Sequence, residues 1–551
     1  MAEFEICGQL VDVVAGEIYP ARVRVADGRI AAVERVADSD VAGKGYIVPG
    51  LVDAHIHIES SMLVPTEFAR LAVRHGTVAT VSDPHEIANV AGIEGVRYMI
   101  DNAAASPMKF HFTAPSCVPA TPFETAGAEL DVAAVTELLS DDTIVGLSEM
   151  MNVPGVLNHD AGVMAKLAAA KQLNKPVDGH APGLRGDAIR HYVGAGIATD
   201  HECFGLDEAR EKAGLGMQVL IREGSAARNF EALWPLLNEY PELCMFCSDD
   251  KHPDDLLHGH IDGMVRRAIA EGVAPMAALR AASLNPVRFY KLPVGLLQSG
   301  DAADFMLVDD LERFTVERCW IDGACVAEAG RSLVESCESG VINRFELGPV
   351  AAADFRLSLQ PGRLRVIDVC DGQLTTSQSL HAPLVADGNV VSDVSADVLK
   401  IAVINRYGGG TPALGFVRNF GLQSGAIASS VAHDSHNVIV VGCSDEAMAQ
   451  AVNLLVEQGG GVSAVSKHGE RLLALPVGGI MSGDDAFLVA DAYAGLDHMV
   501  REVLGSTLRA PYMTLSFMAL LVIPDIKLSD KGLFDGCRFR FVNLFKEDAD
   551  V

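Results

Sequence analysis

The stretch Leu51-Val-Asp-Ala-His55-Ile-His57 is an apolar run that ends in two histidines. Residues i and i+2 of a strand project from the same face, so both imidazoles can reach one metal ion. A His-x-His pattern also arises by chance, so the pair needs support from elsewhere in the chain. After Gly50 a short apolar run, a few polar residues and a helical pattern follow one another repeatedly. This rhythm is typical of parallel βαβ units.

Eight apolar runs are predicted as strands, and six of them end in His, Asp or Glu. A buried strand gains nothing from a charged tip, whereas the carboxyl ends of the strands build the active site of a (β/α)₈ barrel. We therefore predict an α/β protein with a TIM-type (β/α)₈ barrel over residues 50–296. The runs are 51–57, 77–83, 109–115, 143–149, 176–180, 197–201, 217–221 and 243–249.

The flanks of the predicted barrel carry other patterns. Short runs of alternating polarity before residue 50, with a turn at Asp27-Gly28, predict a small antiparallel sheet. Residues 262–284 have helical spacing and are expected to close the barrel. The strands predicted at 300–308 and 316–326 are expected to return to the first sheet. The domains are thus a small β-sandwich from both flanks (1–49 and 297–340), the barrel (50–296) and a C-terminal α+β domain (341–551).

Six residues with metal-binding side chains fall at one level of the predicted barrel: His55, His57, Glu149, His180, His201 and Asp249. Imidazole together with carboxylate suits zinc, iron or manganese and does not choose among them. One ion needs three or four protein ligands, so six ligands predict two divalent ions with Glu149 as the bridge.

Composition narrows the class of substrate and the compartment. A formal net charge of −30 repels a phosphate backbone, so no nucleic-acid partner is expected and a small substrate is favoured. Eleven scattered cysteines indicate reduced thiols. The first residues lack the pattern of a secretory signal, and the apolar stretch 513–524 is too short to span a bilayer. We expect a cytoplasmic protein without membrane contact, and a homo-oligomer (a dimer) by base rate.

The segment Val48-Pro-Gly-Leu-Val-Asp-Ala-His55-Ile-His57, with single ligands on later strands, resembles the signature of the amidohydrolase superfamily. Dihydroorotases and hydantoinases of that superfamily place a carboxylated lysine where Glu149 lies. This difference argues against a cyclic amide as the substrate. Four further segments resemble adenine deaminases of the bacterial type, and the likeness reaches into the C-terminal domain. They are Ile58-Glu-Ser-Ser-Met62, Ser82-Asp-Pro-His-Glu-Ile-Ala-Asn89, Ser148-Glu-Met-Met-Asn152 and Ala432-His-Asp-Ser-His-Asn437.

The resemblance implies deamination of adenine to hypoxanthine and ammonia, by a metal-activated hydroxide that attacks C6 of the purine. It implies two divalent ions per chain, Mn²⁺ or Fe²⁺ ahead of Zn²⁺. Asp249 would carry the proton from the attacking water to the departing amine. Glu86 or Asp83 would protonate ring nitrogen N1 or hold the purine edge. The alternative for these two carboxylates is that they cap a helix.

Two other functions stay open. One is an amidohydrolase acting on a different amino-heterocycle or on a cyclic amide. The other is a barrel that serves as a scaffold or binding protein, which predicts lost ligands, although none of the six is missing. The pair His57-Ile-Glu59 and Cys244-Met-Phe-Cys247 imitates the zinc signature of cytidine deaminases. Pro241 stands too far from Cys244 for that signature, so both cysteines are predicted as core thiols.

Several remaining motifs carry weaker predictions. Residues 433–437 could reach over the barrel mouth, but a loop held by side-chain hydrogen bonds is the plainer interpretation. The glycines at 408–410 and 459–461 predict turns, since no Lys-Ser or Lys-Thr follows the first run. Five histidines lack strand-tip positions and are not expected to be ligands: His75, His111, His159, His191 and His258.

Overall fold

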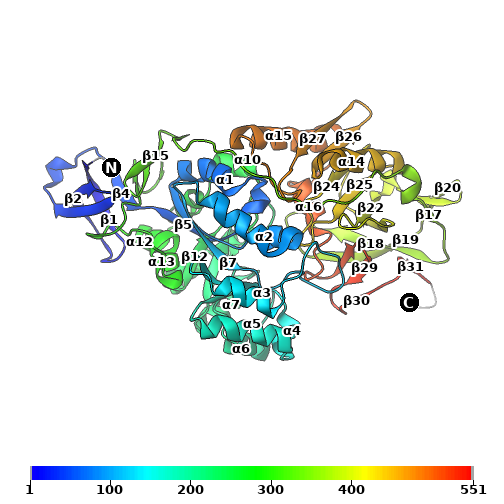
Figure 1. Cartoon of the computed structure of the whole chain (residues 1–551), viewed down its shortest axis with the longest axis horizontal. Coiled ribbons are helices and arrows are strands. Elements are labelled where there is room, and N and C mark those ends of the chain that lie inside the picture. The colour runs from blue at the N-terminus through cyan, green and yellow to red at the C-terminus, as the bar shows by residue number, and fades with distance from the viewer. Residues whose placement is uncertain (1–2, 548–551) are drawn as a thin grey trace.

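An eight-stranded sheet forms the N-terminal end of the molecule in this computed structural model, which describes residues 3–547 (Figure 1). Strand β13 runs antiparallel to β4, with Phe305 opposite Pro49, so chain segments from before and after the barrel region share one sheet. In spatial order the strands are β16 (Arg331–Ser332), β15 (Ala324–Glu328), β14 (Val316–Ile321), β13 (Phe305–Val308), β4 (Tyr46–Pro49), β1 (Phe4–Asp12), β2 (Glu17–Ala26) and β3 (Arg29–Arg35).

This N-terminal sheet curls back on itself. The rings of Phe4 in β1 and Trp320 in β14 stack with centroids 6.0 Å apart. Three strand spacings of about 4.8 Å separate β1 from β14 along the sheet, so a flat sheet would keep these rings apart. The expected β-sandwich is therefore a single curled sheet that encloses its own apolar core.

A strand of the central region overlaps each of the eight predicted runs. Five strands form one parallel sheet in chain order, and three form a second parallel sheet. The first sheet consists of β5 (Leu51–Ile56), β6 (Thr77–Ser82), β7 (Lys109–Ala114), β8 (Ile144–Met150) and β9 (Val177–Gly179), and the second of β10 (Thr199–Asp200), β11 (Gln218–Arg222) and β12 (Cys244–Cys247).

Backbone hydrogen bonds join the edges of these two parallel sheets. Asp249, after β12, donates its N–H to the carbonyl of His55 at 3.0 Å and accepts from the N–H of His57 at 3.3 Å. On the other side, Ala198 donates to the carbonyl of Val177 at 2.9 Å. The carboxyl ends of the strands, where the charged residues lie, thus face the same way.

Helices separate the parallel strands. The single helical segment expected at 262–284 is broken, because Gly272 adopts φ +92° and Pro275 starts a new helix. Residues 280–284 then continue as a π-helical turn. The helices are α1 (Pro65–Ala72), α2 (His85–Ala103), α3 (Val132–Leu139), α4 (Val153–Leu157), α5 (Ala161–Gln172), α6 (Gly186–Gly194), α7 (Leu206–Gly214), α8 (Phe230–Leu233), α9 (Leu236–Glu239), α10 (Pro253–His258), α11 (Ile261–Ala270), α12 (Pro275–Leu279) and α13 (Asn285–Tyr290).

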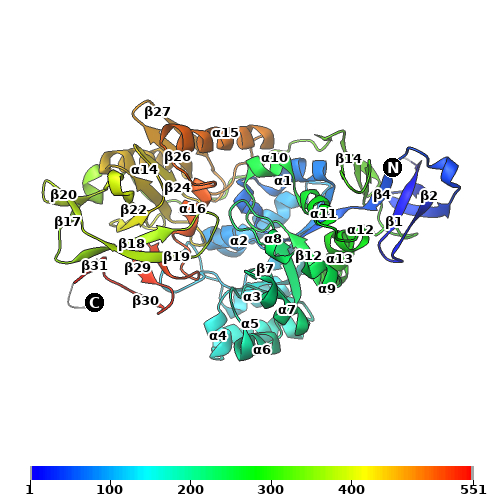
Figure 2. The same ribbon diagram turned by 180° about the vertical axis from the view of Figure 1, so that it is seen from behind.

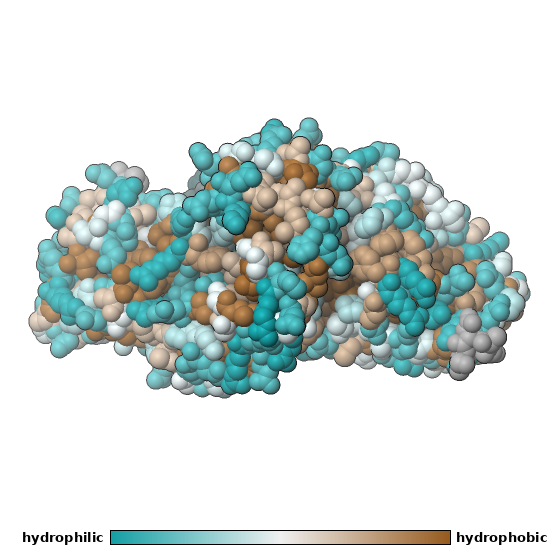
Figure 3. Space-filling model, turned by 90° about the horizontal axis from the view of Figure 1, so that it is seen from below, coloured by the Kyte–Doolittle hydropathy of each residue, from teal (hydrophilic) through white to brown (hydrophobic). Residues whose placement is uncertain are grey.

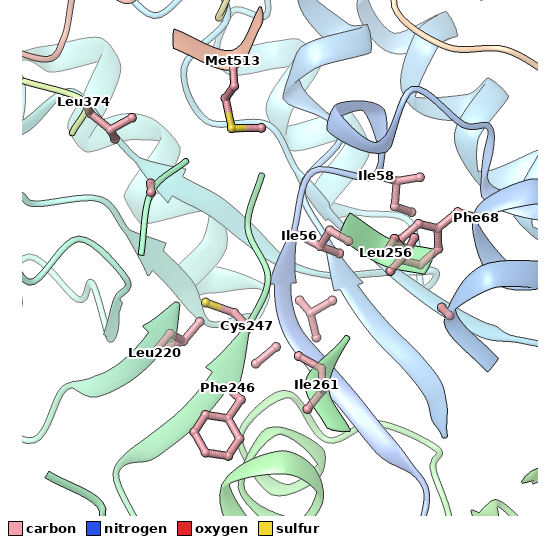
Figure 4. Close-up of a cluster of buried hydrophobic side chains, with 14 of the residues drawn as sticks. Ile56, Ile58, Phe68, Leu220, Phe246, Cys247, Leu256, Ile261, Leu374 and Met513 are labelled. Atoms are coloured by element: carbon pink, nitrogen blue, oxygen red, sulfur yellow. The ribbon is translucent and has the colours of Figure 1, made fainter. Parts of the chain in front are cut away.

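One hydrophobic cluster fills the central region and continues into the C-terminal region. Ile56, Leu220 and Phe246 lie on three of the parallel strands and are buried (Figure 4). Leu374 and Met513, from the C-terminal region, belong to the same cluster and lie towards the carboxyl ends of the strands. Burial of this shared apolar surface favours the packing of the two regions on each other.

The C-terminal region is an α+β arrangement around a nine-stranded sheet (Figure 2). Helix α14 (Asp445–Gln458) begins where the Ser444 hydroxyl accepts the N–H of Ala447, and it ends at Gly459 in the left-handed conformation. The other helices are α15 (Ala486–His498) and α16 (Pro511–Phe517). Across the boundary between the regions, Arg70 of α1 donates to Asp485 at 2.8 Å.

The strands of the main C-terminal sheet are, in spatial order, β19 (Thr376–His381), β18 (Arg363–Val369), β23 (Ala413–Arg418), β22 (Val398–Ile404), β25 (Val438–Gly442), β24 (Ala426–Ser429), β26 (Gly461–Ser466) and β27 (Gly469–Ala474), with β31 (Phe545–Lys546) beside β18. Two smaller sheets contain β17 (Leu357–Ser358), β21 (Asn389–Val391) and β20 (Leu384–Ala386), and β28 (Ile526–Ser529), β29 (Gly532–Asp535) and β30 (Arg540–Phe541).

The surface seen from below is largely hydrophilic, with apolar residues in separate patches (Figure 3). Within residues 3–547, no helix is both long enough and apolar enough to cross a bilayer.

Candidate metal centre

The structure brings the six predicted ligand residues together at the carboxyl ends of the parallel strands. His55 and Glu149 lie in β5 and β8, and the others directly follow a strand or stand two residues beyond it. All six are buried. Buried histidines and carboxylates from five strands therefore meet at one point.

Glu149 lies at the centre of this cluster. Its Oε2 atom is 3.0 Å from Nδ1 of His180 and 3.0 Å from Nε2 of His201. Its Oε1 atom is 3.7 Å from Nε2 of His57. Asp249 Oδ1 lies 3.2 Å from Nε2 of His57 and 3.5 Å from Nε2 of His55. The Glu149 carboxylate thus faces His180 and His201 with one oxygen and His57 with the other.

Hydrogen bonding shows that these residues fit a metal ion. Nδ1 of His57 lies 3.1 Å from the carbonyl oxygen of Asp83 and must donate to it. In neutral His57, Nε2 then presents a lone pair towards Asp249 and Glu149, and either a proton on Nε2 or a metal cation between them would relieve the repulsion. A histidine ligand commonly donates its other ring N–H to a carbonyl in this way. Among described atoms, the buried Nε2 atoms of His55 and His180 have no hydrogen-bond partner.

The electrostatics of the cluster favour positive charge. Burial opposes the charged form of His180, but Glu149 and Glu202 outweigh it and raise its pKa to about 9. Burial likewise opposes the charged form of His57, and the pKa of His57 is still raised by Asp249 and other carboxylates. Carboxylates that stabilise imidazolium here would also stabilise a divalent cation.

Arg222 and Glu202 belong to the site and escaped the sequence analysis. Arg222 ends β11 and donates from Nη1 to Oδ2 of Asp249 at 2.6 Å. Its Nη2 donates to Oε2 of Glu202 at 3.1 Å. The sequence prediction ended that strand at Ile221 and so gave it an uncharged tip. The sequence did contain a signal for them, because Arg222 and Glu202 each stand one position beyond the predicted end of a strand.

The segment after β6 contributes three polar residues in different ways. His85 Nδ1 lies 3.0 Å from Oδ2 of Asp83 and 3.6 Å from Oε1 of Glu149. Asp83 lies behind His85 and also accepts its backbone N–H at the start of α2. Glu86 borders the cavity described next. The sequence analysis quoted His85 within its motif but did not assign it a role.

A cavity lies beside the cluster. One wall comes from the strand ends of the central region, and the opposite wall comes from the C-terminal region. The second wall is formed by Leu374, His433, Asp434, Phe517 and Leu520. The sequence analysis gave the segment 433–437 two interpretations, and its first two residues line this cavity.

The two cysteines and five histidines that the sequence analysis did not expect to be metal ligands lie elsewhere in the molecule. Cys244 and Cys247 are fully buried in β12, and burial raises the pKa of the Cys247 thiol well above its ordinary value. Both are core thiols, as expected. His75 makes a hydrogen bond to the carbonyl of Leu256 at 2.9 Å. Within residues 3–547, none of the five histidines predicted not to be ligands lines the cavity.

Two family descriptions match the chain. Residues 46–326 match the Amidohydrolase family, and residues 373–540 match the adenine deaminase C-terminal domain. The chain is 54% identical over 545 residues to an adenine deaminase of Salinibacter ruber, covering 99% of each protein. It is 54% identical over 539 residues to an adenine deaminase of Sulfurovum sp., covering 98% of this chain and 99% of that protein.

Among solved structures, the chain is similar to a beta-aspartyl dipeptidase of Fervidobacterium islandicum. The sequence identity is 14% and the TM-score is 0.46, over 61% of this chain and 100% of that one.

Proposed function

The chain belongs to the adenine deaminase family of the amidohydrolases, and from this premise we propose that it hydrolyses adenine to hypoxanthine and ammonia. The observation that carries the proposal is the convergence of six buried histidines and carboxylates, centred on Glu149, beside a cavity that both regions line.

The two parallel sheets are proposed to form one (β/α)₈ barrel. The hydrogen bonds of Asp249 with His55 and His57, and of Ala198 with Val177, support this reading because they link both pairs of sheet edges. The domains proposed with it are the curled sheet of 1–49 and 297–340, the barrel of 50–296 and the C-terminal domain of 341–551. Catalytic residues at the carboxyl ends of barrel strands agree with the general rule for this architecture.

Two divalent cations are proposed for the cluster, held by the six residues with Glu149 shared between them. Imidazole and carboxylate donors accept Mn²⁺, Fe²⁺ and Zn²⁺, and the order with Mn²⁺ and Fe²⁺ first is the one that the family resemblance implies. When bound, such ions lower the pKa of coordinated water and polarise the substrate.

Asp249 is proposed to carry the proton of the attacking water. Burial alone would raise its pKa, but Arg222 and the neighbouring histidines lower the pKa well below its ordinary value. Arg222 occupies Oδ2, so Oδ1 is the oxygen that faces the histidines and can accept a proton. As the water oxygen bonds to C6, Asp249 takes the released proton and delivers it to the amine as the C6–N bond breaks.

Glu86 and Asp83 are proposed to act at the purine ring in different ways. Glu86 borders the cavity and is placed against the edge of the base. Asp83 orients His85, since its carboxylate accepts from both the ring and the backbone of that residue. His85 also borders the cavity, so Asp83 reaches the substrate through it.

The test is ammonia release by metal-reconstituted protein, offered adenine, adenosine, guanine, cytosine and dihydroorotate separately, with metal content measured on the same sample. Hypoxanthine from adenine alone, with about two metals per chain, is the expected result. Two bound metals together with turnover of another compound would support the metal centre and contradict adenine as the substrate. Protein that binds no metal after reconstitution would reject the centre itself.

A further inference from the structure

Glu86 occupies an unusual position for a carboxylate. It lies in the first turn of α2 and is 1% exposed. Its ligand atoms and those of His57 and His85 fall within 4.8 Å of one another, and its side chain borders the cavity. A buried carboxylate is costly unless its oxygens are hydrogen-bonded. The partners of Glu86 therefore indicate what keeps it there.

Both oxygens of Glu86 meet histidines of the C-terminal region. Nδ1 of His433 contacts Oε1, and Nε2 of His436 contacts Oε2. Nδ1 of His436 accepts the backbone N–H of Ala432 at 3.2 Å. Neutral His436 carries its proton on Nε2, but neither this atom nor Oε2 of Glu86 has a hydrogen-bond partner among the described atoms. The carboxylate is thus held by one donor, His433, which stands about 350 residues away in sequence.

The loop that carries these histidines is fixed to both regions. Ser435 donates to Oε2 of Glu124 at 2.7 Å, and Asn437 donates to the carbonyl of Thr125 at 2.8 Å. On the other side, the N–H of His433 donates to the hydroxyl of Ser516 in α16 at 3.1 Å. The contact with Glu86 is thus part of a built junction and not a chance approach of a surface loop.

We propose that His433 is a positioning residue, which holds Glu86 as a hydrogen-bond acceptor against an N–H edge of the amino-heterocycle. The C-terminal domain thereby completes a site whose reacting half lies on the parallel strands. Oε1 of Glu86 accepts from His433, whereas the buried Oε2 has no hydrogen-bond partner among the described atoms, and Glu86 borders the cavity. An N–H donor is the ligand group that would pair with this oxygen. This inference rests on the proposed function, since it places the substrate in the same cavity.

The experiment compares holoenzyme variants in kcat and KM for adenine, metal content and affinity for hypoxanthine. His433→Ala removes the donor, and His433→Gln returns an amide N–H. His468→Ala is the matched control, because His468 is an exposed histidine of the same domain. We expect His433→Ala to lower kcat/KM by about 10–100-fold, with unchanged metal content and weaker hypoxanthine binding. His433→Gln should recover part of the loss, and His468→Ala should match the wild type.

A double-mutant cycle with Glu86→Gln tests whether the histidine acts through Glu86. If it does, Glu86→Gln combined with His433→Ala is no slower than Glu86→Gln alone. Additive losses overturn the proposal, as does a His433→Ala enzyme within twofold of an active wild type. Loss of activity in step with loss of metal would also overturn it, because the role would then be structural. A wild type inert towards adenine would instead reject the proposed function, and the positioning role with it.

Discussion

The two walls of the cavity are built in different ways. On one side, His55, Glu149 and Asp249 stand at the ends of parallel strands, where a backbone ladder sets their spacing. On the other side, Leu374, His433 and Phe517 come from a turn, a loop and the end of a helix. The first wall gathers charge at the edge of a rigid sheet, and the second adds apolar surface and hydrogen-bond donors.

This difference suggests a division of labour. A sheet edge holds ligand atoms to within a fraction of an ångström, which metal binding and proton transfer require. Loops carried by a second domain can be shaped to one substrate without disturbing that geometry. We therefore expect changes on the first wall to act on turnover, and changes on the second wall to act on substrate binding.

The largest effect is expected from Asp249→Asn on the strand-end wall. Asparagine keeps one oxygen near His57 but cannot take a proton, so kcat should fall by about 10²–10⁴-fold while metal content is largely kept. Steady-state kinetics with metal analysis would measure both. Asp187→Asn, an exposed aspartate of α6, is the control and should be silent. Turnover close to that of the wild type would remove Asp249 from the proton path.

A smaller effect is expected from Phe517→Leu on the C-terminal wall. The Phe517 ring stacks on His433 with centroids 5.1 Å apart and borders the cavity. Losing an aromatic face costs about 1 kcal/mol of base stacking, or roughly fivefold in KM, with kcat little changed. Phe355→Leu, in the separate core under α14, should leave KM unchanged. A fall in kcat at constant KM would contradict the division of labour.

A separate effect, on stability and not on turnover, concerns Lys527, a fully buried residue of β28 that contacts two segments of the second wall. Its ammonium donates to the carbonyls of Leu374 at 2.7 Å and Phe517 at 2.9 Å. Burial lowers the pKa of Lys527 to about 7, whereas in the unfolded chain lysine keeps its proton up to about pH 10. Between these values the unfolded state binds more protons, so stability should rise as pH increases from 7 towards 10.

Lys527→Met should flatten this dependence. Urea unfolding at pH 7, 8 and 9 would give the free energy of unfolding of both proteins, with Lys171→Met, at an exposed position of α5, as the control. An unchanged slope in Lys527→Met would show that Lys527 keeps its proton in the fold.

Much of the strand-end wall could be predicted from the sequence, because its residues follow local patterns. Apolar runs of strand length, each ending in a polar residue, are visible without tertiary contacts, and His55 and His57 share a face through strand periodicity alone. The coarse fold, a mixed α/β region followed by a C-terminal domain, follows from the same patterns. The errors were also local, such as the helix break at Gly272 and the strand end placed before Arg222.

The C-terminal wall depended on tertiary structure. Nothing in the local sequence around Glu86 indicates that His433 and His436 will contact it, because the contact spans about 350 residues and arises only when the two regions pack together. The same holds for Lys527, whose burial is set by the segments packed around it. The sequence by itself determined which residues could do chemistry at the strand ends. Only the packing of one region on another decided what faces them across the cavity, since side chains from distant segments meet through burial and not through periodicity.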